Sequence, residues 1–328
     1  MTNEIYCSNC AHKNSANSIF CESCGEILRN TNLLNINQQI NTIDELFNEE
    51  KQRSLNDFIL TLEIYEIIIQ NIIENGQNNI IYKRNMTTFQ RVKEIAKAYT
   101  IVTTKEDEKS YGEYLFNIIK VDNNFDSAQQ IATLLHELTH FLFNEIIKQI
   151  LMYIWNIKSS SMLDAYIQTI TSIPQILLIS EYCASSTERE FLDEKYVSFS
   201  SFNSICHDIN YDEDIIKKAL IIGKPMSESI INILNNFIDK QLKIQIKKEF
   251  IKNNTKANMK PICINDEVIP NFPIFRNVNL MNLICESYEI TNEEEIHEKI
   301  VNYEKIVKNI EKQRIENLKK QEEYNIEL

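Results

Sequence analysis

Glycine, proline and histidine are scarce in this chain of 328 residues, which holds four, five and five of them respectively. So few turn-forming residues argue against a many-stranded sandwich or barrel and favour long helices. Basic residues are also outnumbered, 34 against 47 acidic ones, and the net charge of −13 argues against a broad nucleic-acid-binding surface. We therefore expect a mostly α-helical protein with a small β-sheet, an α+β fold.

The sequence also lacks long apolar runs and an export signal. Its start, MTNEIYCSNC, has no basic segment followed by an apolar one, so we expect no signal peptide. Apolar runs such as residues 173–179 are far shorter than the roughly 20 residues that a membrane span needs. We expect a cytoplasmic protein, in which the eight cysteines are better explained as thiols or metal ligands than as disulfides.

Four of the cysteines form two CxxC pairs near the N-terminus, Cys7 with Cys10 and Cys21 with Cys24. Four thiolates are enough to close a tetrahedral structural zinc site. A piece of roughly 25 residues cannot bury a useful core, so the metal would have to fold it. The pattern resembles the short zinc ribbon at the front of many bacterial proteins, over residues 1–28. We interpret this ribbon as a docking or regulatory module for a protein partner, because it lacks a basic face.

The rest of the chain divides into an Asn/Gln-rich linker over residues 29–45, a large domain over 46–290 and a charged helical tail over 291–328. Apolar spacing predicts one helix from about residue 55 to a stop at Gly76 and a second over 88–98. Strand-like runs follow at 99–104 and 114–121, separated by a charged turn that contains Gly112. Further helices are predicted at 144–157, 163–171, 174–193, 215–222, 226–252 and 278–288.

The stretch LLHELTH holds two of the five histidines, His136 and His140, four residues apart. Asp126 is well placed as the N-cap of a helix that carries them. Residues four apart share one face of a helix, so both rings would reach one ion. Glu137 would then lie beside the ion without binding it, where it can take a proton from a zinc-bound water. An accidental H-E-x-x-H is expected in fewer than roughly one chain in a hundred of this composition.

A strand, an HExxH helix and later helices together resemble the zincin metallopeptidases, and no third histidine follows closely enough for the metzincin pattern. The chain is most similar to the compact gluzincins, including the ImmA/IrrE-type bacterial peptidases, over roughly residues 99–195. This resemblance implies zinc-dependent hydrolysis of peptide bonds, with a glutamate on a later helix as the third ligand. Glu181 fits that role best, Glu188 is the main alternative, and Ser185 could hold a ligating histidine in place.

Two functions remain open from the sequence. The first is a zinc metallopeptidase, a hydrolase with one catalytic and one structural zinc ion, in which Glu137 is the general base acting on a protein or peptide substrate. His207 is a candidate donor to the oxyanion of that reaction, as are Tyr182, Tyr196 and Tyr211. The second is a non-catalytic regulatory or protein-binding module that docks through the ribbon. The intact Glu137 favours the enzyme.

Overall fold

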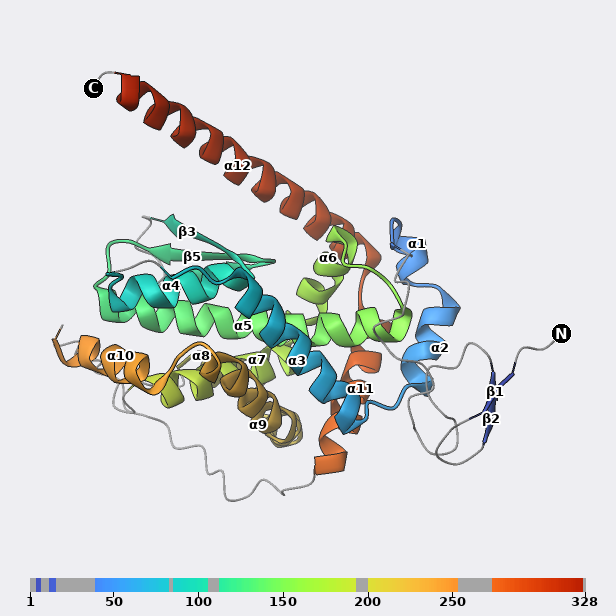
Figure 1. Cartoon of the computed structure of the whole chain (residues 1–328). Helices are drawn as coiled ribbons and strands as arrows, with labels where there is room; N and C mark the ends of the chain where they lie inside the picture. Colours follow the sequence, from blue (N-terminus) through green and yellow to red (C-terminus); the bar gives the residue numbers. More distant parts are fainter. Residues whose placement is uncertain are drawn as a thin grey trace.

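The computed structural model describes residues 4–6, 12–15, 39–82, 85–105, 112–192, 200–252 and 273–326, which form a mostly helical fold with a small sheet (Figure 1). This architecture agrees with the α+β class predicted from the sequence. The strands are β1 (Glu4–Tyr6), β2 (Lys13–Ser15), β3 (Ile101–Lys105), β4 (Gly112–Leu115) and β5 (Ile118–Asp122). The helices are α1 (Ile43–Leu46), α2 (Glu49–Asp57), α3 (Leu62–Asn79), α4 (Thr88–Tyr99), α5 (Ser127–Trp155), α6 (Ser161–Ile170), α7 (Pro174–Phe191), α8 (Ser200–Asp208), α9 (Glu213–Asn235), α10 (Lys240–Lys252), α11 (Pro273–Ile290) and α12 (Glu293–Ile326).

The N-terminal segment contains the antiparallel pair β1–β2. The predicted zinc ligands of the ribbon lie outside the described residues, so the ribbon stays a prediction: Cys7, Cys10, Cys21 and Cys24. Helix α1 lies inside the segment 29–45 that we expected to be a linker, and Thr42 caps it by accepting the backbone N–H of Glu45. Because Ile40 is also buried in the core, the packed body begins before residue 46.

Helix α5 forms the centre of the fold and carries the HELTH motif. Asp126 caps its N-terminus, as predicted, by accepting the backbone N–H of Gln129. The helix then continues without a break to Trp155, so the predicted helix at 144–157 is its C-terminal part. Its 29 residues are about 43 Å long and are buried on several sides, because α3, α4, α7, α9 and the sheet all pack against it.

Two predictions for the first helices need correction. The helix expected from about residue 55 to Gly76 is two helices, α2 and α3, and Thr61 caps the second by accepting the N–H of Ile64. Gly76 lies within α3 and does not end it. A β carbon at Gly76 would lie 2.2 Å from Tyr99 Oη and 2.8 Å from Phe237 Cζ, so the glycine allows close packing of neighbouring helices.

The sheet has the order β3–β5–β4, with β3 parallel and β4 antiparallel to β5. The run 114–121, expected to be one strand, is a hairpin whose turn holds Phe116 and Asn117. Phe116 has a left-handed backbone with φ of 56°, and its N–H donates to Gln168 Oε1 of α6. A neighbouring helix therefore stabilises a turn that has neither glycine nor proline at its centre.

Helices α6 to α10 follow the predicted pattern with three differences. Pro174 begins α7, where a proline costs no helical hydrogen bond. Helix α8 was not predicted, and α9 continues through Pro225, which the prediction had placed between two helices. Helix α10 is separate from α9, whereas the sequence suggested one helix over 226–252.

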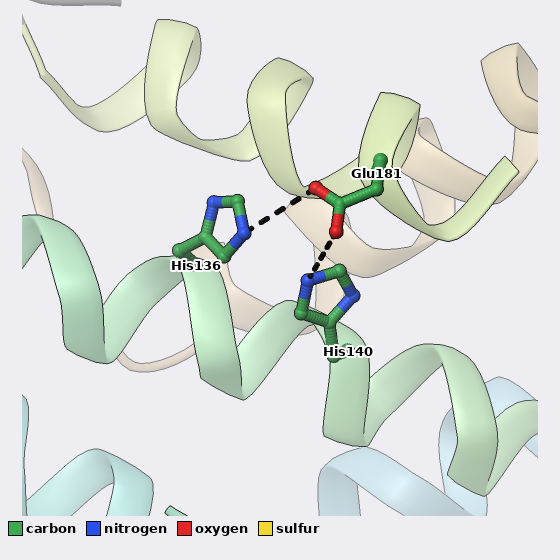
Figure 2. A group of neighbouring side chains, drawn as sticks. All are labelled: His136, His140 and Glu181. Atoms are coloured by element: carbon green, nitrogen blue, oxygen red, sulfur yellow. Dashed lines mark ion pairs between the residues drawn. The ribbon is translucent and has the colours of Figure 1, made fainter. Parts of the chain in front are cut away.

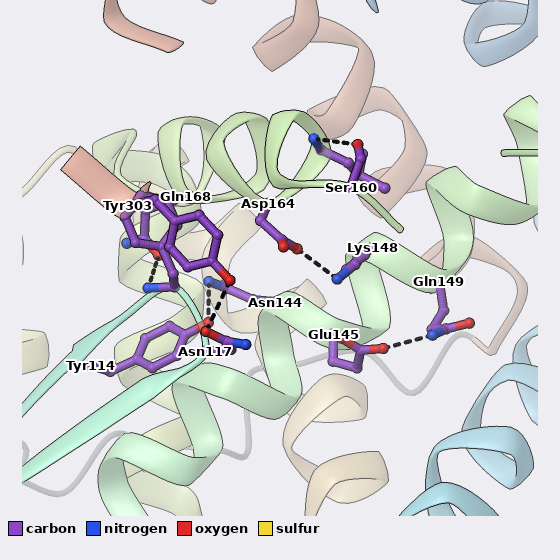
Figure 3. Close-up of polar contacts among 12 residues, drawn as sticks. Tyr114, Asn117, Asn144, Glu145, Lys148, Gln149, Ser160, Asp164, Gln168 and Tyr303 are labelled. Atoms are coloured by element: carbon purple, nitrogen blue, oxygen red, sulfur yellow. Dashed lines mark hydrogen bonds and ion pairs between the residues drawn. The ribbon is translucent and has the colours of Figure 1, made fainter. Parts of the chain in front are cut away.

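The tail is helical, as predicted, and the first part of α12 packs on the body. Its Tyr303 Oη lies 3.3 Å from Asn117 Oδ1 (Figure 3). The Tyr303 ring lies 4.4 Å from that of Phe116. Nearby, Asn144 Nδ2 donates to Tyr114 Oη at 3.2 Å, which ties α5 to the hairpin. Farther along, α12 projects beyond the other helices in Figure 1.

Among the described helices, none by itself combines the length and the apolar character required to cross a membrane. The pair α6 and α7, bent by 91°, meets that requirement together by length and composition only.

Candidate metal centre

Helices α5 and α7 bring three candidate metal ligands together. His136 and His140 lie one turn apart on α5, and Glu181 faces both of them from the middle of α7 (Figure 2). These three side chains form a group that could hold a metal ion, with one donor atom from each within 4.8 Å of the others. The three residues that sequence reasoning named as the ligand set are therefore neighbours in the structure.

The distances within this group suit metal ligation better than direct hydrogen bonding. His136 Nε2 is 3.5 Å from Glu181 Oε2, and His140 Nε2 is 3.5 Å from Glu181 Oε1. A charged N–H···O hydrogen bond would be about 2.7–2.9 Å long. Two zinc–ligand bonds of about 2.0–2.1 Å that meet at a tetrahedral angle hold their donor atoms about 3.4 Å apart.

The Glu181 carboxylate also has an oxygen without a hydrogen-bond partner. Its Oε2 is buried and accepts no hydrogen bond within the described part of the chain. Burying a carboxylate oxygen without a hydrogen-bond partner costs free energy, whereas a bound cation would stabilise it. The residues present therefore fit a metal ion by both spacing and chemistry.

The outer nitrogen of each histidine ring is held by a second residue of α7. His136 Nδ1 lies 2.9 Å from Glu188 Oε1, and because a carboxylate only accepts, the ring donates. His140 Nδ1 lies 2.7 Å from Ser180 Oγ. These contacts direct both Nε2 atoms towards Glu181. Glu188, the alternative ligand from the sequence, thus contacts the nitrogen opposite the candidate site, and Ser180 holds a ring where Ser185 had been expected to do so.

Burial and the neighbouring charges shift the pKa values of the cluster. Burial lowers the pKa of His140 to about 4, which leaves a neutral ring of the kind that binds metals. Burial also disfavours a charge on His136, but its contacts with Glu181 and Glu188 outweigh that effect and raise its pKa. For Glu181, burial is outweighed by His140, His136 and the Ser201 hydroxyl, so its pKa lies below the ordinary value.

Glu137 lies beside this cluster and next to the start of β4. Burial raises the pKa of its carboxyl to about 7. A β carbon on Gly112 would lie 3.1 Å from Glu137 Oε1 and 2.2 Å from Thr133 Cγ2. Gly112, expected in a charged turn, is therefore a strand residue whose missing side chain lets the sheet approach the HELTH helix. The sequence did not predict that Gly112 allows this close approach. Its one signal was a single glycine just before a predicted strand.

His207 is not brought to the cluster. Its side chain is 79% exposed on α8, and its Nδ1 lies 3.7 Å from Asp208 Oδ1. It follows Ser201 by six residues, a rotation of about 240° around the helix, and so faces away from the side that contacts Glu181. Among the other candidate oxyanion donors, Tyr182 is buried against Phe202, Tyr211 is exposed, and Tyr196 lies outside the described residues.

In comparisons with known proteins, no family model matches the chain, and neither a curated protein nor a solved structure matches it. The similarity to gluzincins therefore remains a prediction from the sequence motif.

Proposed function

We propose that this chain is a zinc-dependent metallopeptidase that hydrolyses peptide bonds of a protein or peptide. The proposal rests on one observation: His136 and His140 of the buried helix α5 and Glu181 of α7 converge beside Glu137. Two histidines and one carboxylate are a ligand set of catalytic zinc sites, which keep a further coordination position for water or substrate. A bound zinc ion would supply Lewis acidity towards the scissile carbonyl and lower the pKa of a bound water.

The residues of the chain have distinct roles in this proposal. His136 and His140 hold the metal through Nε2, because Glu188 and Ser180 occupy their Nδ1 atoms. Glu137 takes a proton from the attacking water and passes it to the leaving amine. A general base works best with a pKa near the working pH, and burial brings that of Glu137 to about 7.

The position of β4 favours an extended peptide as the substrate. By strand order β4 is at one edge of the sheet, and it packs against α5 next to Glu137. Extended peptides commonly bind by adding a strand to the edge of a sheet. A substrate aligned along β4 would have its backbone close to Glu137 and the metal ligands.

The test combines metal content with hydrolysis of a quenched fluorescent peptide library. We expect His140→Ala to lose the metal of this site together with activity, because it removes a ligand. Glu137→Gln should keep the metal and lose at least about 10²-fold in rate, because it removes only the proton acceptor. If Glu137→Gln hydrolyses peptides at the wild-type rate, the mechanism is wrong. A metal-loaded wild-type chain that cleaves no library member would instead favour the non-catalytic module.

A further inference from the structure

Helix α10 carries an excess of positive charge on an acidic protein. Its 13 residues contain five lysines and one glutamate, a net charge of +4 in a chain of net charge −13. One of these lysines, Lys243, forms an ion pair with Glu190. Within the described part of the chain the other four have no carboxylate within ion-pair distance: Lys240, Lys247, Lys248 and Lys252. Elsewhere in the described chain, lysines such as Lys120 and Lys148 do pair with an acidic group.

The outward face of α10 is also partly apolar. Leu242, Ile246 and Phe250 lie on one side and are buried in the core. On the opposite side Ile244 and Ile251 are 47% and 64% exposed. They are seven residues apart, so they lie on one stripe of the helix, with lysines between and beside them. We call this surface the basic face of α10, formed by Lys240, Ile244, Lys248, Ile251 and Lys252.

Contacts with three other helices hold this face in place near the candidate metal centre. Glu249 accepts from Ser127 of α5 at 3.0 Å, and Gln245 accepts from Arg91 of α4 at 3.3 Å. Lys243 pairs with Glu190 of α7, which is two residues beyond Glu188, the partner of the His136 ring. The basic face therefore belongs to a helix that packs beside the part of α7 that supports the metal cluster.

We propose that the basic face of α10 binds an acidic, amphipathic segment of a partner protein. Carboxylates of such a segment would pair with Lys240, Lys248 and Lys252, and its apolar side chains would cover Ile244 and Ile251. The length also fits, since a 13-residue helix is about 20 Å long and matches a short peptide segment.

The charge of the whole chain favours this partner over a larger polyanion. A duplex or an anionic membrane extends far beyond one helix, and it would meet the remaining surface, whose residues outside α10 sum to a charge of −17. Phosphate backbones also offer little to the two exposed isoleucines, whereas a protein segment can cover them. The inference does not require the proposed hydrolysis. If the chain is a peptidase, the bound segment would belong to its substrate.

Binding can be measured without hydrolysis by using the full chain with Glu137→Gln. The probe is a fluorescein-labelled 15-residue peptide in which glutamates alternate with leucines at helical spacing, followed by fluorescence anisotropy. We expect the triple variant Lys240→Gln, Lys248→Gln and Lys252→Gln to bind it about tenfold more weakly, since each exposed ion pair changes affinity a few-fold. Peptide binding by the Glu137→Gln chain with all its lysines should also weaken between 50 and 300 mM salt, about the range over which surface ion pairs are screened.

A matched triple variant on other helices controls for net charge: Lys217→Gln, Lys218→Gln and Lys308→Gln. It removes the same charge and should bind the peptide like the unsubstituted chain. A second variant, Ile244→Ser with Ile251→Ser, keeps every lysine and should also bind more weakly, because it removes the apolar contact. Equal losses in the α10 and control triple variants would overturn the proposal, as would tighter binding of a DNA duplex or of anionic phosphatidylserine vesicles than of the peptide.

Discussion

Removing the Glu188 carboxylate should weaken metal binding without removing a ligand. In the structure Glu188 Oε1 accepts from His136 Nδ1 at 2.9 Å, which fixes the ring so that Nε2 faces Glu181. Without that acceptor, the ring can rotate and the nitrogen becomes a poorer donor to the metal. Loss of such an outer partner typically costs 10- to 100-fold in metal affinity. We therefore expect Glu188→Ala to bind zinc about 10- to 100-fold more weakly, or by about 1.4–2.8 kcal/mol.

The assay is a competition between the protein and a chelating dye for zinc, in a chain with Cys21→Ser and Cys24→Ser, so that the ribbon does not contribute. Glu188→Gln keeps an acceptor oxygen but loses the charge, and its affinity should lie between those of wild type and Glu188→Ala. Glu190→Ala is the matched control, because this residue pairs with Lys243 and has no described contact with a histidine. It should leave zinc affinity unchanged.

Two outcomes would refute this reasoning. If Glu188→Ala binds zinc as tightly as wild type, the contact with His136 has no orienting effect. If it loses zinc as completely as His136→Ala does, Glu188 is itself a ligand and the assignment of Glu181 is wrong. Cobalt substitution separates these cases, because loss of a ligand changes the visible absorption of the bound ion, whereas loss of an outer partner mainly changes its affinity.

Two further predictions follow from the structure and the sequence. Gly112→Ala should destabilise the fold and reduce activity, because its β carbon would lie 2.2 Å from Thr133 Cγ2. Adding Thr133→Ala should restore much of the melting temperature. If it restores nothing, the close approach of Gly112 to Thr133 does not matter. Replacing Cys21 and Cys24 by serine should remove one of two zinc ions and leave the downstream one, as measured by metal analysis; joint loss of both metals would show that the ribbon is not a separate unit.

The features predicted correctly from the sequence depend on local signals. Helix α4 begins where Thr87 and Gln90 form a capping box, and α5 begins at the cap supplied by Asp126. The HELTH spacing alone brings His136 and His140 to one face, because four residues make about one helical turn. Such signals are complete within a few residues, so no knowledge of the tertiary structure is needed to read them.

The features that were missed depend on contacts between distant segments. The turn at Phe116 has no glycine or proline at its centre, and its left-handed residue is supported by Gln168 of α6 and by Tyr303 of α12. Gly76 looked like a helix end, but its role is to admit Tyr99 and Phe237. In both cases a residue far along the chain determines the local conformation, and nothing near the site in the sequence identifies that residue.

The roles of Glu181 and Glu188 illustrate the same limit at the candidate site. The two residues are seven apart on α7 and therefore share a face, so the sequence ranked Glu181 first as the third ligand and kept Glu188 as the main alternative. Their different positions come from the packing of α5 against α7, which puts Glu181 opposite both Nε2 atoms and Glu188 opposite one Nδ1.

The cost of this arrangement is itself an argument for a bound cation. Glu137, Glu181 and Glu188 lie close enough together that Glu181 and Glu188 both raise the pKa of Glu137, in a site where burial has the largest effect. Grouping three carboxyls in a buried site is unfavourable unless positive charge accompanies them. Burial keeps His140 neutral, and a protonated His136, which would supply such a charge, cannot offer Nε2 as a ligand. A divalent metal ion between these residues would balance the carboxylates, satisfy Glu181 Oε2 and allow both histidines to bind as neutral rings.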